Sequence, residues 1–452
     1  MHEGRHDLYN GLVTDVDLML RVLLQILVVL GTCKIVGWLG VRFLGQTQVV
    51  MEMLAGVALG PSLFGIIAPK LQAWLFPINV TYVIDGVTTT AHHPSMVALY
   101  IISQLGLILY MFNVGLEFNH RLIEHRAKGA ISISIAGIAA PFVLGVVIAA
   151  MTFHGWGLFD AKIYLLNACI FFGAAMCITA FPMLARIIYE QGISATSMGT
   201  LALGAGAVDD AVAWSILAVV LAASKGSMTY AVYAIGGGAL FAFLVLKFAG
   251  PIFARLSKTI EETGEMPQSI FVTTLLFVFL GAFITDAIGV YAFFGAFLIG
   301  IAMPRGRFVD EIRKKTESLT VGLLLPFFFV YSGLNTSLGL IDSAAMAGLT
   351  LVVIIAAIAG KGIACALAAR ASGEGWSESV AIGTLMNARG LMELIILNIG
   401  IQQGVITQRF YTIMVVMAIV TTLMASPIFR WIFNRHLVHL VVPTGKSMEQ
   451  IC

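Results

Sequence analysis

The chain is divided into about thirteen apolar runs, most of them long enough for a helix that crosses a bilayer. They cover roughly residues 18–39, 47–66, 97–117, 129–151, 162–187, 197–223, 229–256, 268–286, 288–303, 319–336, 344–370, 378–402 and 409–433. Of the 452 residues only 11% are charged, whereas about 25% of a soluble protein is charged. No soluble fold buries that much apolar surface. We therefore expect an all-α polytopic membrane protein.

Basic residues between these runs predict the orientation. Alternate connections, counted with the C-terminal tail, hold 17 Lys and Arg residues, and the opposite set holds five. Loops rich in positive charge stay in the cytoplasm, so we expect a cytoplasmic C-terminus and, with an odd number of spans, an external N-terminus. The acidic first 17 residues do not resemble a signal peptide, and we expect the N-terminus to be retained. The short loops indicate a bacterial cytoplasmic (inner) membrane, and we expect no soluble domain after the last span.

The same survey argues against several partners. The basic residues are not gathered on one face, so we expect no nucleic-acid partner. The five cysteines are scattered through apolar runs without the spacing of a metal site. His92 and His93 lie in the longest external loop, where we interpret them as solvated residues. We expect no cofactor.

Few charged residues remain at bilayer depth, where each costs about 2.5–3.5 kcal/mol to insert. Asp209 and Asp210 stand in the sixth run, in LGAGAVDDAVAW; Lys361 stands in the eleventh, and Arg389 with Glu393 in the twelfth. Intramembrane ionisable residues of this kind indicate a functional site. The alternative, a buried pair kept for helix packing, leaves two costly charges unexplained.

Asp209 and Asp210 cannot have equal roles on one helix. Neighbouring residues of an α-helix point about 100° apart, so one carboxylate faces an ion cavity while the other faces an adjacent helix. Burial and a nearby like charge both favour the protonated form of a carboxylate. Such a group holds either a proton or a metal cation. Competition for one site is sufficient for exchange if the site opens alternately to each side.

The basic residues near mid-span require partners. Lys361 lies among Ala and Gly, too far from a helix end to reach water, so we expect it to pair with one of the two aspartates. Arg389 and Glu393 are four residues apart, and we expect them to pair within their own helix. For these two, a structural role is favoured over direct contact with an ion.

Two of the runs are interrupted. The fifth reads CITAFPMLARI, with Thr179 before Pro182, and the twelfth reads TLMNARGLMELI, where Asn387 and Gly390 weaken the helix. Interrupted helices in corresponding places of two halves indicate the midplane site of a transporter. Freed carbonyls and half-helix ends then supply partial charges for an ion.

Six ordered motifs resemble the monovalent cation:proton antiporter family, which includes Kef-type potassium efflux systems, plant CHX exchangers and bacterial sodium/proton antiporters. The motifs are LAGVALGPSLFG (54–65), LGLILYMFNVGLEF (105–118), TAFPMLARI with LALGAGAVDDAVAW (179–187 and 201–214), YAFFGAFLIGIAMPRG (291–306), LLPFFFVYSGL (324–334) and NARGLMELIILNIG (387–400).

The resemblance implies a homodimer with inverted repeats, an elevator-like mobile core and two crossing broken helices. It implies dimerisation halves at 1–128 and 266–340, core halves at 129–228 and 341–452 (the latter with a short cytoplasmic tail), and a linker helix at 229–265. It also implies Asp210 as the ion-binding and proton-carrying residue, with Asp209 as the partner of Lys361. Thr179 and Asn387 would lie beside the crossing, supported by Pro182, Arg389, Gly390 and Glu393.

The chain departs from this family at Asp209. CHX-like members typically have Asn before the ion-binding aspartate and Kef members often have Gln. Double-aspartate members are usually associated with electrogenic exchange, so we expect electrogenic exchange of protons for K⁺, Na⁺ or both. Kef proteins also carry a nucleotide-sensing domain, which is not expected here.

Two other functions use similar features. A Kef-like cation channel or efflux path would need a ring of carbonyls or charges rather than one titratable carboxylate. An intramembrane aspartyl protease would need two aspartates that face each other from different helices. Asp209 and Asp210 are on one helix, so we expect a transporter and no enzyme.

Overall fold

Long apolar helices form nearly all of the computed structural model, which describes residues 15–44, 46, 48–77, 79–84, 87–117, 127–191, 193, 196–224, 228–334, 336, 338–433 and 435. Within these ranges, nine helices are long and apolar enough to cross a membrane, with shorter apolar helices at Leu165–Cys177 and Ala292–Ile301. Every one of the predicted apolar runs coincides with helical elements. The predicted membrane fold is therefore confirmed. The extreme N-terminus and most of the C-terminal tail lie outside the described residues.

The first half of the chain contains α1 (Asp15–Leu39), η2 (Gly40–Leu44), α2 (Gln48–Leu59), α3 (Phe64–Ile67), α4 (Pro69–Leu75), β1 (Asn79–Ile84), β2 (Val87–His92), α5 (Pro94–Glu117), α7 (Ala127–Thr152), α8 (Leu165–Cys177), α9 (Phe181–Glu190) and α10 (Ser197–Ser224). Next come α11 (Met228–Leu244), η3 (Val245–Ala249) and α12 (Gly250–Thr263).

The second half contains α13 (Gln268–Ile288), α14 (Ala292–Ile301), α15 (Arg307–Leu319), η4 (Thr320–Leu324), α16 (Leu325–Leu334), η5 (Leu338–Leu340), α17 (Ala344–Ala357), η6 (Ile358–Ile363), α18 (Ala364–Ala371), α19 (Trp376–Met386), α20 (Leu391–Gln402) and α21 (Gln408–Ile432). The fifth predicted run corresponds to α8 and α9, and the twelfth to α19 and α20.

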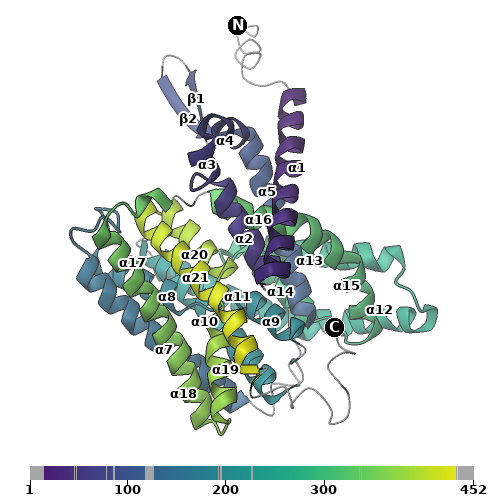
Figure 1. Ribbon diagram of the computed structural model, residues 1–452. Helices are drawn as coiled ribbons and strands as arrows, with labels where there is room; N and C mark the ends of the chain where they lie inside the picture. The colour runs from purple at the N-terminus through teal and green to yellow at the C-terminus, as the bar shows by residue number, and fades with distance from the viewer. Residues whose placement is uncertain are drawn as a thin grey trace.

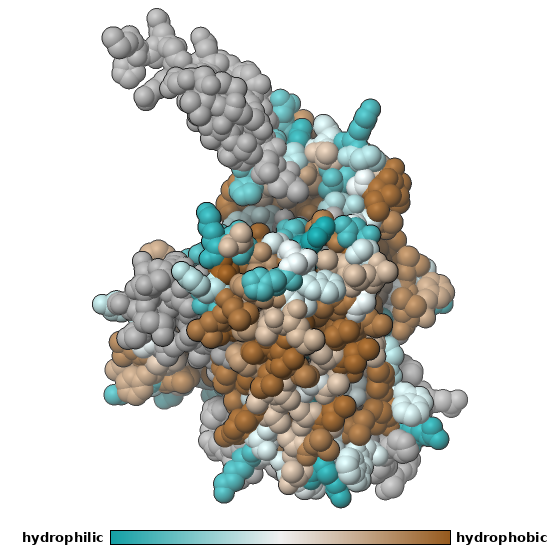
Figure 2. Space-filling view, turned by 90° about the vertical axis from the view of Figure 1, so that its left-hand side faces the viewer, coloured by the Kyte–Doolittle hydropathy of each residue, from teal (hydrophilic) through white to brown (hydrophobic). Residues whose placement is uncertain are grey.

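The helices gather in two groups, which Figure 1 shows side by side. One group contains α7, α8, α9, α10 and α17–α21; the other contains α1, α2, α5 and α13–α16. The groups meet where α2 packs against α21, α16 against α20, and α5 against α9. On the face shown in Figure 2, apolar side chains form a broad middle band with hydrophilic side chains above and below it, as a bilayer requires.

Close helix crossings in both groups depend on small residues. A Cβ added to Gly333 of α16 would lie 2.1 Å from the carbonyl carbon of Gly56 in α2. A Cβ added to Gly383 of α19 would lie 2.3 Å from the carbonyl oxygen of Gly362 in η6. Membrane helices associate through such close contacts because lipid provides no hydrophobic driving force between them. The second crossing fixes the segment that carries Lys361.

The segment before α5, predicted as the longest external loop, has regular structure. It contains short helices and an antiparallel hairpin of β1 and β2, in which Asn79 pairs with His92 and Ile84 with Val87. The strands NVTYVI and VTTTAH are rich in β-branched residues, which favour extended backbone. His92 is exposed as expected. His93 is buried instead, and its Nδ1 lies 2.9 Å from the hydroxyl of Ser95 at the start of α5.

Candidate functional site

The first helix break separates α8 from α9. α8 ends at Cys177, and Ile178 has an extended backbone with φ −68° and ψ 137°. Pro182 is the second residue of α9. A proline is favoured in the first turn of a helix because its missing N–H has no intrahelical partner there. The break therefore precedes the proline, and Pro182 lies in the first turn of the second half-helix.

The second break separates α19 from α20 and meets the first. Asn387 caps α19, and Gly390 has a φ of 148°, which only glycine adopts readily. The backbone N–H of Ala180, in the first break, donates to the carbonyl oxygen of Ala388, in the second, at 3.1 Å. The two broken helices thus cross, as predicted.

Asp209 of α10 is buried and fully bonded. Its Oδ1 accepts from the hydroxyl of Ser134 at 2.5 Å. Its Oδ2 accepts from the hydroxyl of Thr179 and lies 3.0 Å from Nζ of Lys361. A buried carboxylate is tolerated when it is paired and hydrogen-bonded in this way. The structure therefore gives Asp209 a fixed position among three partners.

Lys361 has a partner for each of its three N–H donors. Besides Asp209, it donates to the carbonyl oxygen of Gly137 at 3.1 Å and to that of Cys177. It belongs to η6, a π-helical segment between α17 and α18, and its side chain is fully buried. π-helical turns often occur at functional sites. The ammonium group of Lys361 thus connects η6 to α7, α8 and α10 by hydrogen bonds.

Asp210, one residue further on, has the opposite environment. It is 5% exposed, and neither carboxylate oxygen has a hydrogen-bond partner among the described residues. The backbone N–H of Phe181, at the start of α9, lies close enough to interact with it. A buried carboxylate without a partner is costly. Of the two adjacent aspartates, Asp210 is therefore the one whose oxygens have no hydrogen-bond partner in the described structure.

The charges at the crossing match the ends of the half-helices. Arg389 donates to the carbonyls of Ala175 and Met176, beside the Cys177 carbonyl bound by Lys361, so two cations lie at the C-terminal end of α8. Asp210 faces the N-terminus of α9, and Glu393 lies in the first turn of α20. Helix C-termini attract cations and N-termini attract anions. These charges therefore stabilise helix ends that would otherwise be buried unpaired.

Arg389 and Glu393 pair as predicted, but not within one helix. Arg389 lies in the break before α20, and its backbone exchanges hydrogen bonds with the hydroxyl of Thr422 in α21. Its Nη1 is still 3.8 Å from an oxygen of Glu393, because Gly390 turns the chain between them. Both side chains are buried.

The remaining predicted residues lie close to this cluster. Thr179 contacts Asp209 rather than Asp210. The side-chain amide of Asn387 donates to the Gly383 carbonyl at 3.3 Å and lies against η6. Sequence reasoning missed Ser134, although a serine in the apolar run ISISIAG was a signal that a buried polar group needed it.

Removing the charge of Lys361 should destabilise the protein strongly. Lys361→Met leaves Asp209 buried without its cation, and breaking one side of a buried pair costs about 3–5 kcal/mol. We expect a large drop in the apparent melting temperature in detergent, and Asp209→Asn added to Lys361→Met should restore most of it. Lys314→Met, which breaks an exposed pair with Glu311, is the control and should change little. Equal melting temperatures for Lys361→Met and the native protein would contradict the ion pair.

The chain is similar to known proteins over most of its length. Residues 27–435 match the family model described as "Sodium/hydrogen exchanger, transmembrane". The chain is 36% identical over 416 residues to the Na(+)/H(+) antiporter NhaS4 of Synechocystis sp., covering 92% of this chain and 97% of that one. It is 37% identical over 433 residues to Cation/H(+) antiporter 17 of Arabidopsis thaliana, covering 95% of this chain and 49% of that one. The chain thus spans about half the length of the plant relative.

The fold is also similar to a solved structure. The sodium proton antiporter MjNhaP1 from Methanocaldococcus jannaschii superposes with a TM-score of 0.59 and 13% sequence identity, covering 94% of this chain and 100% of that one. At this identity the likeness concerns the fold alone. Because the family model covers most of the chain and the cyanobacterial relative is matched over nearly its whole length, this protein belongs to the sodium/hydrogen exchanger family.

Proposed function

We propose that the protein is a secondary active antiporter that exchanges protons for K⁺, Na⁺ or both at Asp210. One observation carries this proposal. Of two adjacent buried carboxylates, Asp209 has partners at both oxygens, and Asp210 has none within hydrogen-bond distance in the described structure. The printed names of the relatives, a sodium/proton and a cation/proton antiporter, support the same exchange.

Exchange follows from competition at one carboxylate. Protonated Asp210 is neutral and suits its apolar surroundings, whereas ionised Asp210 needs a counter-charge. A monovalent cation supplies that charge when it replaces the proton. Carbonyl oxygens in the two breaks are the protein groups that would complete its coordination, since extended backbone leaves them outside helix hydrogen bonds.

Alternating access needs one part of the protein to move against another. We assign the moving core to 129–228 and 341–452, the dimerisation halves to 1–128 and 266–340, and the linker helix to 229–265. All side chains around Asp209 come from the proposed core. Ion and proton would then cross the membrane by an elevator-like movement of the core.

The contacts between the two groups suit such a movement. Among the described residues, these contacts include isolated hydrogen bonds. The side-chain amide of Gln46 donates to the carbonyl of Leu423 at 2.8 Å. The hydroxyl of Tyr411 donates to the carbonyl of Ser332 at 3.3 Å. The dimerisation halves would pair with those of a second copy to form a homodimer. We place the protein in a bacterial inner membrane, with the C-terminus in the cytoplasm.

We further propose that exchange is electrogenic. Exchange of one proton for one cation at Asp210 moves no net charge, so electrogenic exchange must move unequal numbers of protons and cations in each cycle. A second buried carboxylate, Asp209, lies next to Asp210 and supports an exchange of that kind. Lys361 affects the charge beside the site, since it is bonded to the aspartate adjacent to Asp210.

Replacing Asp210 should abolish exchange without unfolding the protein. Asp210→Asn can neither bind a proton reversibly nor balance a cation, so proton movement driven by Na⁺, K⁺ or Li⁺ in proteoliposomes should fall to that of protein-free vesicles. Its melting temperature should be unchanged or higher, because a neutral amide is cheaper to bury than an unpaired carboxylate.

Asp209→Asn is the matched control for that variant. It should lower the melting temperature, because it leaves Lys361 charged and unpaired. Full exchange in Asp210→Asn would overturn the assignment of the site. Conductance of the cation without coupled proton movement would instead favour a channel.

The charge moved per cycle is tested by voltage. In proteoliposomes whose potential is clamped through an ion that the protein does not carry, native exchange should respond to a change from zero to inside-negative potential. Lys361→Ala should retain some exchange but alter this response, because the charge pair beside Asp210 is gone. An identical response in the two proteins would contradict a role for Lys361 in the charge moved per cycle.

A further inference from the structure

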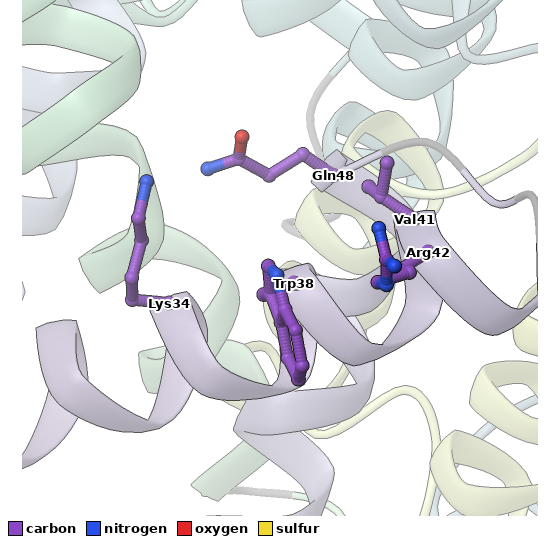
Figure 3. Close-up of a pocket in the computed structure, with 6 residues that line it drawn as sticks. Lys34, Trp38, Val41, Arg42 and Gln48 are labelled. Atoms are coloured by element: carbon purple, nitrogen blue, oxygen red, sulfur yellow. The ribbon is translucent and has the colours of Figure 1, made fainter.

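A cavity of about 490 Å³ lies outside the crossing, where α1 passes through η2 into α2. Its lining includes Lys34, Trp38 and Arg42, one from each successive turn, with Gln48 on the opposite wall. Figure 3 shows the side chains of Lys34 and Gln48 directed toward the same space, with Trp38 between Lys34 and Arg42 along the helix. Two cationic groups and an amide thus line one pocket.

Within the described part of the chain, neither cation has an acidic partner. None of the ion pairs found among the described residues includes Lys34 or Arg42, and both side chains are exposed. The nearby acidic residue, Glu52, is buried behind the pocket wall and accepts a hydrogen bond from Gln48 at 2.9 Å. The pocket therefore presents net positive charge with donors on two sides, which suits an anion.

The rim of the pocket is apolar and faces outward. Trp38 is 57% exposed, Phe43 68% and Leu44 61%, although each is a large apolar side chain. Further apolar side chains are exposed along α1 toward its N-terminus, at Ile35, Leu27, Leu23 and Leu20. An indole beside basic groups at the end of a span is typical of the depth of lipid headgroups. The pocket therefore suits an anionic group that is attached to a hydrocarbon chain.

We propose that the pocket binds the phosphate headgroup of an anionic phospholipid, held by Lys34 and Arg42, with Trp38 against the glycerol region. The acyl chains would lie along the exposed apolar face of α1. A free phosphate ion would satisfy the charges but would leave that apolar rim uncovered. The pocket lies at the end of α1 that the basic loops place in the cytoplasm, where a leaflet with anionic lipids attracts Lys and Arg by about 1 kcal/mol each.

The position of the pocket connects lipid binding to the contact between the two helix groups. Gln46 lies between η2 and α2, and its side-chain amide bonds to Leu423 of α21. A lipid that orders this connection would therefore stabilise the contact between the two helix groups. Binding should raise the melting temperature of the protein as well as occupy the pocket.

The test is native mass spectrometry of the purified full chain in detergent, titrated with phosphatidylglycerol and separately with phosphatidylcholine. We expect phosphatidylglycerol adducts that Lys34→Gln combined with Arg42→Gln weakens by about tenfold to thirtyfold, from roughly fivefold per charge at a lipid surface. Lys247→Gln with Arg255→Gln removes the same charge from exposed residues elsewhere and should leave the adducts unchanged. Thermal stabilisation by the lipid should follow the same order.

Three results would overturn the proposal. The first is equal binding of phosphatidylglycerol by the pocket variant and the native protein. The second is competition by soluble glycerol 3-phosphate at the same concentration as the lipid, which would indicate a site for free phosphate. The third is a changed oligomeric mass with an unchanged lipid count, which would indicate that a second copy covers the pocket.

Discussion

The structure of the crossing depends on one buried ion pair, Lys361 with Asp209. Two charges are taken out of water there, and only complete hydrogen bonding makes that tolerable. Ser134, Thr179 and the carbonyls of Gly137 and Cys177 supply it. The pair thereby connects η6 to α7, α8 and α10, and it leaves the neighbouring Asp210 as a carboxylate with no bonding partner of its own in the described structure.

The two helix breaks make this arrangement possible. Each break ends one half-helix and starts another inside the protein, so backbone groups that a continuous helix would satisfy are left without helical partners. Lys361 and Arg389 donate hydrogen bonds to carbonyls at the C-terminal end of α8. Asp210 and Glu393 lie near the N-termini of α9 and α20. Cations therefore lie at a helix C-terminus and acidic residues near helix N-termini. In the proposed exchange, Asp210 gains one negative charge when it releases its proton, and one monovalent cation balances that charge.

Much of this could be predicted from the sequence, for identifiable reasons. Charges in apolar runs are rare enough that Asp209, Asp210 and Lys361 stand out individually, and adjacency on a helix requires unequal roles for the two aspartates. Pro182 and Gly390 mark the breaks because their backbone preferences are local. Predictions were wrong where the structure depends on non-local contacts, or where a simple spacing pattern suggested a helix that is interrupted. The i,i+4 spacing of Arg389 and Glu393 suggested one helix face, but Gly390 interrupts the helix between them.

Other features could not be read from local pattern. Ser134 is one hydroxyl among several in apolar runs, and only packing shows that it bonds Asp209. The segment before α5 is predicted as a loop, but it contains a hairpin whose strands are rich in Val and Thr. The cationic pocket forms between α1 and α2, where Lys34 had been counted as part of an apolar run. Contacts between elements, rather than propensities, create it.

The central claim is that proton and cation compete for Asp210 alone, and proton release measures this most directly. Purified protein in weakly buffered detergent solution should release protons when Na⁺ or K⁺ is added, in proportion to the cation bound. Asp210→Asn should release none, whereas Asp209→Asn, where it folds, should still release protons. Undiminished release from Asp210→Asn would contradict the account.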